Sequence, residues 1–170
     1  MSIAGNQNNP ARSEFDWYPT HKSWTHVLLR HQNLPNLIYE PCAGDGSMSN
    51  VLSSHGHTVI ASDIAPRVES VVSKDAMNVG PVECVVTNPP YREIKKLIPY
   101  WLGNTEILCL LLRLNYIEGK TRIDITRKAS KIIVIAGRMI VFDKVSQFPH
   151  AWFIWDKAHT GKTELVIDTP

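Results

Sequence analysis

Tyr39-Glu40-Pro41-Cys42-Ala43-Gly44-Asp45-Gly46-Ser47 is a glycine-containing segment that follows an apolar run of strand length, Leu37 to Glu40. Its glycines, Gly44 and Gly46, allow a tight turn and let a ligand approach the backbone closely. Asp63 closes the next apolar run, 17 residues after Gly46, and an acid near that spacing can accept hydrogen bonds from ribose hydroxyls. The pattern indicates a nucleotide-binding turn of an open α/β fold, although by itself it also suits a plain turn.

The charge of this turn indicates which ligand it suits. Glu40 and Asp45 make it acidic, which opposes a pyrophosphate and favours a ligand that bears positive charge. A dinucleotide-binding motif would have a third glycine at position 49, where this chain has Ser49. The sequence therefore weakens the nicotinamide interpretation.

Apolar runs of strand length recur along the chain, separated by turn residues or by stretches that could be helical. Such runs indicate a sheet buried on both faces, and hence parallel strands joined by helical crossovers. Lys22 to His31 is expected to form a short amphipathic helix, and Lys157 to Lys162 a hairpin between the last two strands. The expected strands are Leu37 to Glu40, Val59 to Ala61, Val68 to Val72, Val82 to Val86, Ile107 to Leu112, Lys131 to Ala136, Ala151 to Trp155 and Glu164 to Asp168.

Length and composition fit one globular domain. The chain has 170 residues, 44% of them hydrophobic and 20% charged, which excludes a disordered, collagen-like or coiled-coil protein. Residues 1–14 are polar, rich in Asn and without periodicity, so we expect a mobile N-terminal arm there. The rest, residues 15–170, is expected to be a single domain.

The sequence predicts neither export, membrane insertion nor metal binding. The longest apolar run, Ile107 to Leu112, is far shorter than the roughly 20 residues of a membrane helix, and the N-terminus has no signal pattern. We therefore expect a cytoplasmic protein without a membrane partner. The three cysteines suit reduced thiols, and neither they nor the seven histidines have metal-ligand spacing.

Positive charge is concentrated in the middle of the chain. Residues 92–138 contain 10 Lys and Arg against 4 Asp and Glu, a net charge of +6, whereas the whole chain carries +2. A basic segment inside a nearly neutral chain is typical of a surface that binds a polyanion, and it is equally typical of a solvated surface.

A third acid, Asp75, follows the expected strand Val68 to Val72. The carboxyl ends of parallel strands meet at one edge of a sheet, so Asp75 would line one crevice together with Glu40 and Asp63. Taken alone, Asp75 suits a helix N-cap.

Thr87-Asn88-Pro89-Pro90-Tyr91, which ends the expected strand Val82 to Val86, is the most specific segment. Its two prolines fix the backbone and remove two N–H donors, so the carbonyl groups there are rigid and partly free of the sheet. Carbonyl oxygens of Asn88 and Pro89 can accept the two protons of a poorly basic planar amine, and Tyr91 offers a face for stacking. Asn88 is neutral, so we expect an acceptor and not a general base.

The order of these motifs resembles that of S-adenosylmethionine-dependent amino methyltransferases, most of all small phage-type DNA adenine-N6 methyltransferases. The motifs that carry the resemblance are Tyr18-Pro19-Thr20, Glu40 to Gly46, Asp63, Asp75 and Asn88 to Tyr91. The resemblance covers nearly the whole chain. It implies an α/β, Rossmann-like class I methyltransferase fold with a mostly parallel seven-stranded sheet, an antiparallel last strand and helices on both faces. It also implies methyl transfer to the N6 amine of adenine in DNA, in the host cytoplasm if a phage encodes the protein, with restriction-modification as one setting.

The resemblance assigns roles to these residues. Tyr18 to Thr20 and Gly44 to Gly46 would hold the methionine end of S-adenosylmethionine, Asp63 its ribose and Asp75 its adenine amine. The catalytic residues Asn88, Pro89, Pro90 and Tyr91 would hold the target amine in line with the sulfonium methyl group. The implied cofactor-binding residues are Tyr18, Pro19, Thr20, Glu40, Pro41, Ala43, Gly44, Asp45, Gly46, Asp63, Ile64, Asp75, Ala76 and Asn88.

The chain departs from the family pattern in two places. His21 stands where the family often has another proline, and only Arg92 to Thr105 separates Tyr91 from the next expected strand. No separate target-recognition domain fits, so we expect weak or short sequence specificity, with cations that contact phosphate. The residues expected to bind nucleic acid are Arg92, Lys120, Arg122, Arg127, Lys128 and Lys131.

The same motif leaves other substrates open. Asn88 to Tyr91 could serve an RNA base or a protein glutamine equally well, because each presents a planar nitrogen. Protein glutamine methyltransferases with this motif usually carry a helical domain before the glycine turn, and fewer than 40 residues precede it here. A catalytically silent nucleic-acid-binding domain is the alternative that is not an enzyme.

Overall fold

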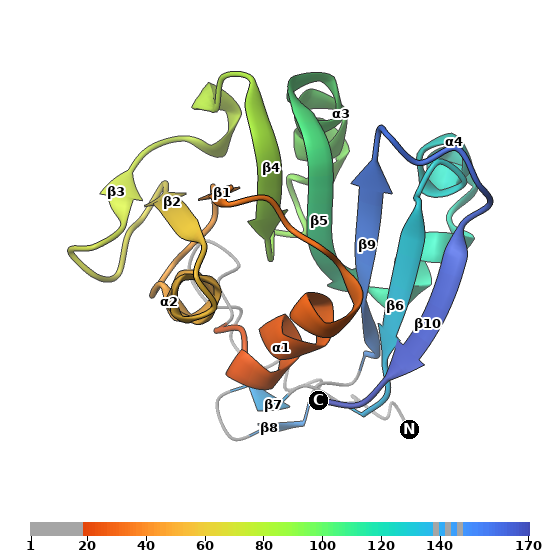
Figure 1. The fold of residues 1–170 in the computed structure, drawn as a ribbon, viewed down its shortest axis with the longest axis horizontal. Coiled ribbons are helices and arrows are strands. Elements are labelled where there is room, and N and C mark those ends of the chain that lie inside the picture. Colours follow the sequence, from red (N-terminus) through yellow and green to blue (C-terminus); the bar gives the residue numbers. More distant parts are fainter. Residues whose placement is uncertain (1–18, 138–139, 142–143, 146–147) are drawn as a thin grey trace, which may run out of the picture.

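The computed structural model describes residues 19–137, 140–141, 144–145 and 148–170 (Figure 1). An eight-stranded sheet has the strand order β10-β6-β9-β5-β4-β1-β2-β3, and β7 and β8 form a separate two-stranded sheet. The predicted mobile arm, residues 1–14, and the predicted cofactor-binding residue Tyr18 lie outside the described residues. The strands are β1 (Leu37–Glu40), β2 (Thr58–Asp63), β3 (Val72–Ser73), β4 (Val82–Thr87), β5 (Thr105–Arg113), β6 (Lys131–Ile135), β7 (Ile140–Val141), β8 (Lys144–Val145), β9 (His150–Asp156) and β10 (Glu164–Asp168).

The predicted fold class is confirmed, and the sheet contains eight strands, one more than the seven that the resemblance implies. Seven of the eight strands run in the same direction, and β9 is antiparallel to both of its neighbours, β5 and β6. The predicted reversal thus falls on β9, while the last strand, β10, runs parallel to β6. The expected strand Val68 to Val72 was wrong in position, because β3 comprises only Val72–Ser73.

The hairpin predicted at Lys157 to Lys162 was wrong. Both edges of β9 are already paired, so β10 passes beyond β6 and pairs with the free edge of that strand. The burial of the two strands agrees with these positions. All of β9 except its last residue is buried, as in a central strand, whereas Leu165 and Ile167 of β10 are exposed, as at an edge.

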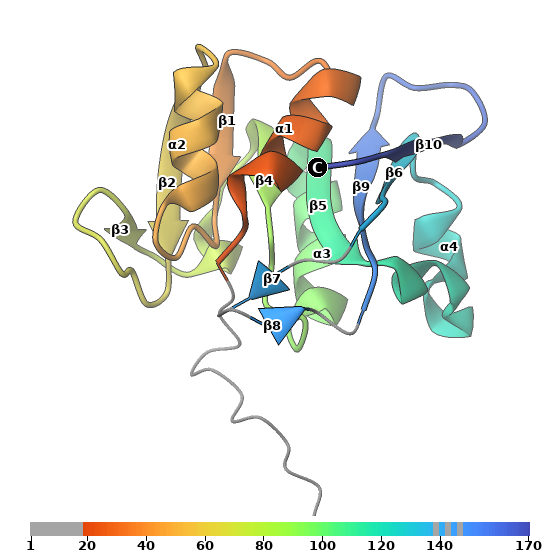
Figure 2. The same ribbon diagram turned by 90° about the horizontal axis from the view of Figure 1, so that it is seen from below.

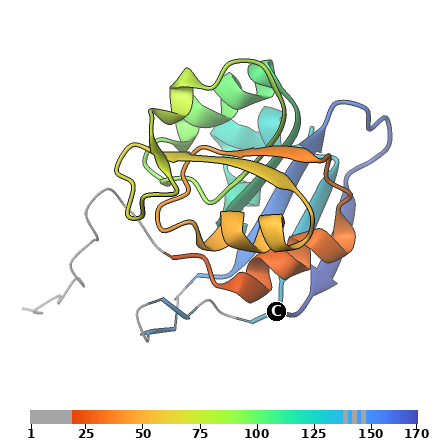
Figure 3. The ribbon, with the colours of Figure 1, turned by 60° about the vertical axis from the view of Figure 1, so that its left-hand side comes forward.

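Helices cover both faces of the sheet (Figure 2). On one face lie α1 (Lys22–His31), as predicted, and α2 (Ser47–Ser54), which contact each other (Figure 3). The other face carries α3 (Ile94–Asn104) and α4 (Ile123–Thr126), with 3-10 helices η3 (Leu114–Glu118) and η4 (Lys120–Arg122) before α4. A further 3-10 helix, η2 (Ala76–Asn78), follows β3. No helix in the described ranges is long and apolar enough to cross a membrane.

Successive side chains of β5 fill both halves of the core. Leu108 and Leu110 pack with the α3 side, whereas Cys109 and Leu111 pack with the α1 side, and all four are fully buried. Burial of each such leucine stabilises the fold by about 1.5–3 kcal/mol. Because both of its faces are apolar, β5 is fixed in the middle of the sheet, and its carboxyl end lies beside that of β4.

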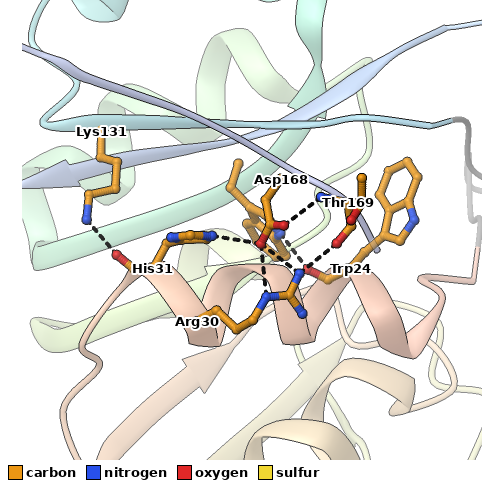
Figure 4. A network of polar contacts seen from close by, with 7 residues as sticks. Trp24, Arg30, His31, Lys131, Asp168 and Thr169 are labelled. Atoms are coloured by element: carbon orange, nitrogen blue, oxygen red, sulfur yellow. Dashed lines mark hydrogen bonds and ion pairs between the residues drawn. The ribbon is translucent and has the colours of Figure 1, made fainter.

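A polar network joins α1 to the end of the chain (Figure 4). Arg30 donates two hydrogen bonds to Asp168, at 2.9 and 2.7 Å, and a third to the carbonyl oxygen of Thr169 at 2.6 Å. His31 Nε2 contacts the same carboxylate oxygen of Asp168 at 2.7 Å, and Lys131 Nζ donates to the carbonyl oxygen of His31 at 2.5 Å. Hydrogen bonds from Arg30, and then from His31, lower the pKa of Asp168 from 3.8 to about 2.

We expect Asp168→Asn to lower the melting temperature at neutral pH, because the amide loses the negative charge that pairs with Arg30. The depressed pKa of Asp168 contributes stability that is present above pH 3.8 and is lost as the pH falls through about 2. The difference in melting temperature between wild type and variant should therefore shrink over this interval in thermal unfolding followed by circular dichroism. Glu69→Gln is the control, since Glu69 is exposed and has no ion pair within the described part of the chain. An equal effect of both variants at every pH would contradict this account.

Candidate functional site

A pocket of about 300 Å³ lies at the edge of the sheet where β1, β2 and β4 end. It brings together residues that are far apart in the sequence, from Thr20 to Leu97. The predicted site residues that line it are Thr20, Glu40, Pro41, Ala43, Asp45, Asp63, Ile64, Asp75, Ala76, Asn88, Pro89, Pro90 and Tyr91. Pro19, Gly44 and Gly46 are not among the lining residues, although both glycines belong to the turn that forms one wall.

Asp63 holds the glycine turn in place. Its Oδ2 accepts a hydrogen bond from the backbone N–H of Gly44 at 2.9 Å, and its Oδ1 accepts one from Ala65 at 2.9 Å. Gly44 and Gly46 have φ angles of 53° and 74°, in the left-handed region that favours glycine. The carboxylate thus ties the end of β2 to the turn after β1, and still has lone pairs that can accept further hydrogen bonds.

Glu40 is a buried acid in the wall of the pocket. Only 2% of its surface is exposed, and it accepts a hydrogen bond from the hydroxyl of Ser49. Burial, opposed by this hydrogen bond and assisted by the nearby charges of Asp45 and Asp63, raises the pKa of Glu40 from 4.5 to about 8. Without a ligand the Glu40 carboxyl is therefore mostly protonated at neutral pH, and a cation bound beside it would favour the charged form.

Asp75 caps a short 3-10 helix. Its Oδ1 accepts a hydrogen bond from the backbone N–H of Met77 at 2.8 Å, which is the N-cap arrangement that the sequence allowed. The Asp75 side chain is exposed and lines the pocket on the β3 side. The second carboxylate oxygen forms no hydrogen bond in the described ranges, so capping does not use the whole group.

The Asn88 side chain is oriented by Thr20. Asn88 follows β4, and its Nδ2 donates a hydrogen bond to Thr20 Oγ1 at 3.1 Å across 68 residues of sequence. Since the amide nitrogen is used in this way, the amide oxygen Oδ1 is the atom left to accept a hydrogen bond from a ligand. Pro89 is buried, and Tyr91 is half-buried with its side chain lining the pocket. The segment therefore presents a fixed acceptor beside an aromatic ring.

Sequence reasoning missed several lining residues. Cys42, Ser47, Met48, Ala65, Arg67, Met77, Glu93, Lys96 and Leu97 also line the pocket. Several of them are next to predicted site residues in the sequence, and this proximity was the only feature of the sequence that could have indicated them. Burial raises the pKa of the Cys42 thiol well above its usual range, which makes it a poor nucleophile. No group of three or more His, Cys, Asp or Glu in the described ranges could hold a metal ion.

The predicted nucleic-acid-binding cations do not form one surface with the pocket. Arg92 is exposed directly after Tyr91, but Lys131 begins β6, at the opposite edge of the sheet, where it pairs with Glu164 at 3.2 Å. Arg122 donates to the carbonyl oxygens of Asn115 and Tyr116 and lies over the Tyr116 ring.

The remaining predicted cations lie on the connection from β5 to β6. Arg127 Nε lies 3.8 Å from Asp124, and Lys120 and Lys128 are exposed. This connection begins at the pocket edge of the sheet and ends at the opposite one, so its cations are spread between the two.

The sequence matches no protein-family model and no curated protein. Solved structures match the fold. PH1948 of Pyrococcus horikoshii, named as a candidate RNA methyltransferase, superposes with a TM-score of 0.62 and 10% identity over 79% of this chain and 81% of that chain. The 23S rRNA methyltransferase ErmE superposes with a TM-score of 0.59 and 16% identity, over 81% of this chain and 68% of that chain. The type IIG restriction endonuclease BpuSI superposes with a TM-score of 0.57 and 16% identity, over 84% of this chain and 26% of that chain.

These likenesses, at identities of 10–16%, concern the fold. The chain has the Rossmann-like fold of class I methyltransferases, as the strand order and the reversed β9 also indicate. In an open α/β sheet a ligand binds outside the carboxyl ends of the strands, which is where the pocket lies.

The raised pKa of Glu40 makes a prediction about pH. Between pH 4.5 and about 8 the folded chain holds a proton that the unfolded chain releases, so stability is highest below 4.5 and falls as the pH rises through about 8. The loss is at most about 1.4 kcal/mol for each pH unit. We expect Glu40→Gln to remove this decline in urea unfolding measured across the interval. Glu83→Gln, which changes an exposed acid, should keep it. A decline that persists in Glu40→Gln would contradict the assignment.

Proposed function

We propose that this chain transfers a methyl group from S-adenosylmethionine to the exocyclic N6 amine of adenine in DNA. One observation carries the proposal: Asn88 to Tyr91 line the same pocket as Glu40, Asp63 and Asp75. An acceptor for a planar amine and an acidic cradle for a cationic nucleoside thus share one cavity.

The acids of the pocket fit S-adenosylmethionine. Glu40 and Asp45 suit a ligand with an amino group and a sulfonium centre, since both carboxylates favour nearby positive charge. Asp63 keeps lone pairs for ribose hydroxyls while it holds the glycine turn, and Asp75 has an oxygen for the adenine amine. When bound, S-adenosylmethionine supplies an electrophilic methyl group on sulfur.

Asn88 and Pro89 act on the target amine. Their carbonyl oxygens accept its two N–H groups, which localises the nitrogen lone pair and stabilises the positive charge that develops during attack. Thr20 keeps the Asn88 amide turned so that oxygen, and not nitrogen, is presented. Tyr91 offers a ring for stacking a base that has been taken out of the helix, at a cost of a few kcal/mol. The surplus proton leaves to water, because Asn88 cannot take it.

A nucleic-acid substrate is supported by charge and by the neighbours. Arg92 is exposed directly beside the motif. It belongs to residues 92–138, whose net charge of +6 is spread between the two edges of the sheet. The structural neighbours include a 23S rRNA methyltransferase and a type IIG restriction endonuclease, so this fold occurs in an enzyme named for RNA and in a restriction enzyme. RNA is therefore the second candidate substrate. The resemblance of the motifs to phage-type DNA adenine-N6 methyltransferases favours DNA.

The proposal predicts that the chain forms N6-methyladenine in unmethylated duplex DNA that is incubated with S-adenosylmethionine. Nucleoside mass spectrometry on the digested DNA measures the product. Asn88→Ala should lower turnover by about 100-fold or more, the scale of losing one donor or acceptor that acts on developing charge, and should leave the dissociation constant for S-adenosylmethionine within about threefold. The modified sites, once sequenced, test the expected weak specificity.

Parallel reactions with ribosomal RNA and with a glutamine-containing protein separate the alternatives. Methylation of RNA alone would move the substrate to RNA, and methylation of the protein alone would move it to glutamine. If the chain does not bind S-adenosylmethionine and does not methylate any substrate, the result would favour the interpretation as a catalytically silent nucleic-acid-binding domain. Equal losses of turnover and of cofactor affinity in Asn88→Ala would contradict the role of this residue.

A further inference from the structure

Arg113, the last residue of β5, lies against the ring of Tyr91. Its guanidinium carbon is 4.9 Å from the centroid of the Tyr91 ring and 4.3 Å from that of Phe148. The two rings come from different parts of the chain, after β4 and before β9. Arg113 does not line the pocket with the acids, so it is a neighbour of the pocket on the Tyr91 side.

Within the ranges that the structure describes, no acid pairs with the positive charge of Arg113. None of the ion pairs within the described ranges involves Arg113, and none of the hydrogen bonds found there uses its guanidinium. Its cross-strand partner in β9 is His150, which is 2% exposed and lies 6.3 Å from the Tyr91 ring, measured between centroids. Burial, and then the charge of Arg113, lower the pKa of His150 to about 4, so His150 is neutral at physiological pH.

The contacts with the two rings leave the N–H groups of the guanidinium available for hydrogen bonds. Aromatic rings interact with the flat faces of an arginine side chain, whereas its five N–H groups point outward in the plane. This planar fork fits two oxygens of a phosphate, and arginine is favoured where such planar recognition is needed. The guanidinium of Arg113 is half-buried, held between rings and without an ion pair in the described ranges. It is thus oriented to bind an anion at a lower entropic cost than a free surface cation would pay.

We propose that Arg113 binds a phosphate group of the nucleotide whose base stacks on Tyr91. This inference rests on the proposed function and deepens it, because it makes a nucleotide, and not a protein amide, the unit that the site recognises. A base stacked on Tyr91 carries its own phosphate a short distance away, linked through one sugar. Arg113 touches the same ring, so it is better placed to reach that phosphate than Lys131, which lies at the opposite edge of the sheet.

The test measures the binding of a fluorescent DNA duplex that contains adenine, by anisotropy, over a series of salt concentrations. For Arg113→Ala we expect the affinity to fall about 10-fold and the slope of log Kd against log salt to drop by about 0.9, the value for one phosphate contact in duplex DNA. Arg113→Lys keeps the charge but not the fork, so it should keep the slope and lose part of the affinity. Calorimetric binding of S-adenosylmethionine should stay unchanged in both variants, which also shows that they fold.

Lys162→Ala is the matched control, since it removes one exposed cation from the connection between β9 and β10, at the opposite edge of the sheet. A salt slope that falls no further in Arg113→Ala than in Lys162→Ala would overturn the inference. The same holds if turnover falls in Arg113→Ala while the slope stays at the wild-type value, because Arg113 would then only support Tyr91. Wild-type protein that binds S-adenosylmethionine but no DNA would overturn the proposed DNA substrate itself, together with this inference.

Discussion

The site depends on the carboxylate of Asp63, which joins two strands through backbone hydrogen bonds. One oxygen holds Gly44 in the turn after β1, and the other holds Ala65 in the turn after β2. Each hydrogen bond contributes about 1.5–3 kcal/mol to stability, since the acceptor is charged. Because the turn is fixed in this way, Glu40, Ala43 and Asp45 all line one cavity beside the end of β4.

Charge divides this edge of the sheet into two parts. The wall formed by the ends of β1 and β2 carries Glu40, Asp45 and Asp63, and it suits a cationic nucleoside. Beyond Tyr91 the charge changes sign, because Arg113 lies over that ring without an acid as its partner in the described residues. Tyr91 lies between the two parts. In the proposed reaction the methyl group would pass from the cationic cofactor to the nucleic acid at this boundary.

The sequence predicted what depends on local backbone geometry. The glycine turn, the acid after β2 and the proline-fixed segment after β4 each have a short pattern with a physical cause, and the structure brings them to one pocket. Long-range pairing could not be predicted. β10 lies beyond β6 because β9 has no free edge, and Arg113 meets Tyr91 only through the order of β4, β5 and β9. The cations of residues 120–131 looked like one cluster but lie along a connection between two edges.

The most direct test of the account is calorimetric titration of the wild-type chain with S-adenosylmethionine, compared with Asp63→Ala and with Asp124→Asn. The account predicts one binding site per chain, a loss of at least about 10-fold in affinity for Asp63→Ala, which is about 1.4 kcal/mol, and no change for Asp124→Asn, whose acid lies in α4 on the connection between β5 and β6. Absence of binding by the wild type, or equal binding by wild type and Asp63→Ala, would contradict the claim that this pocket is the cofactor site.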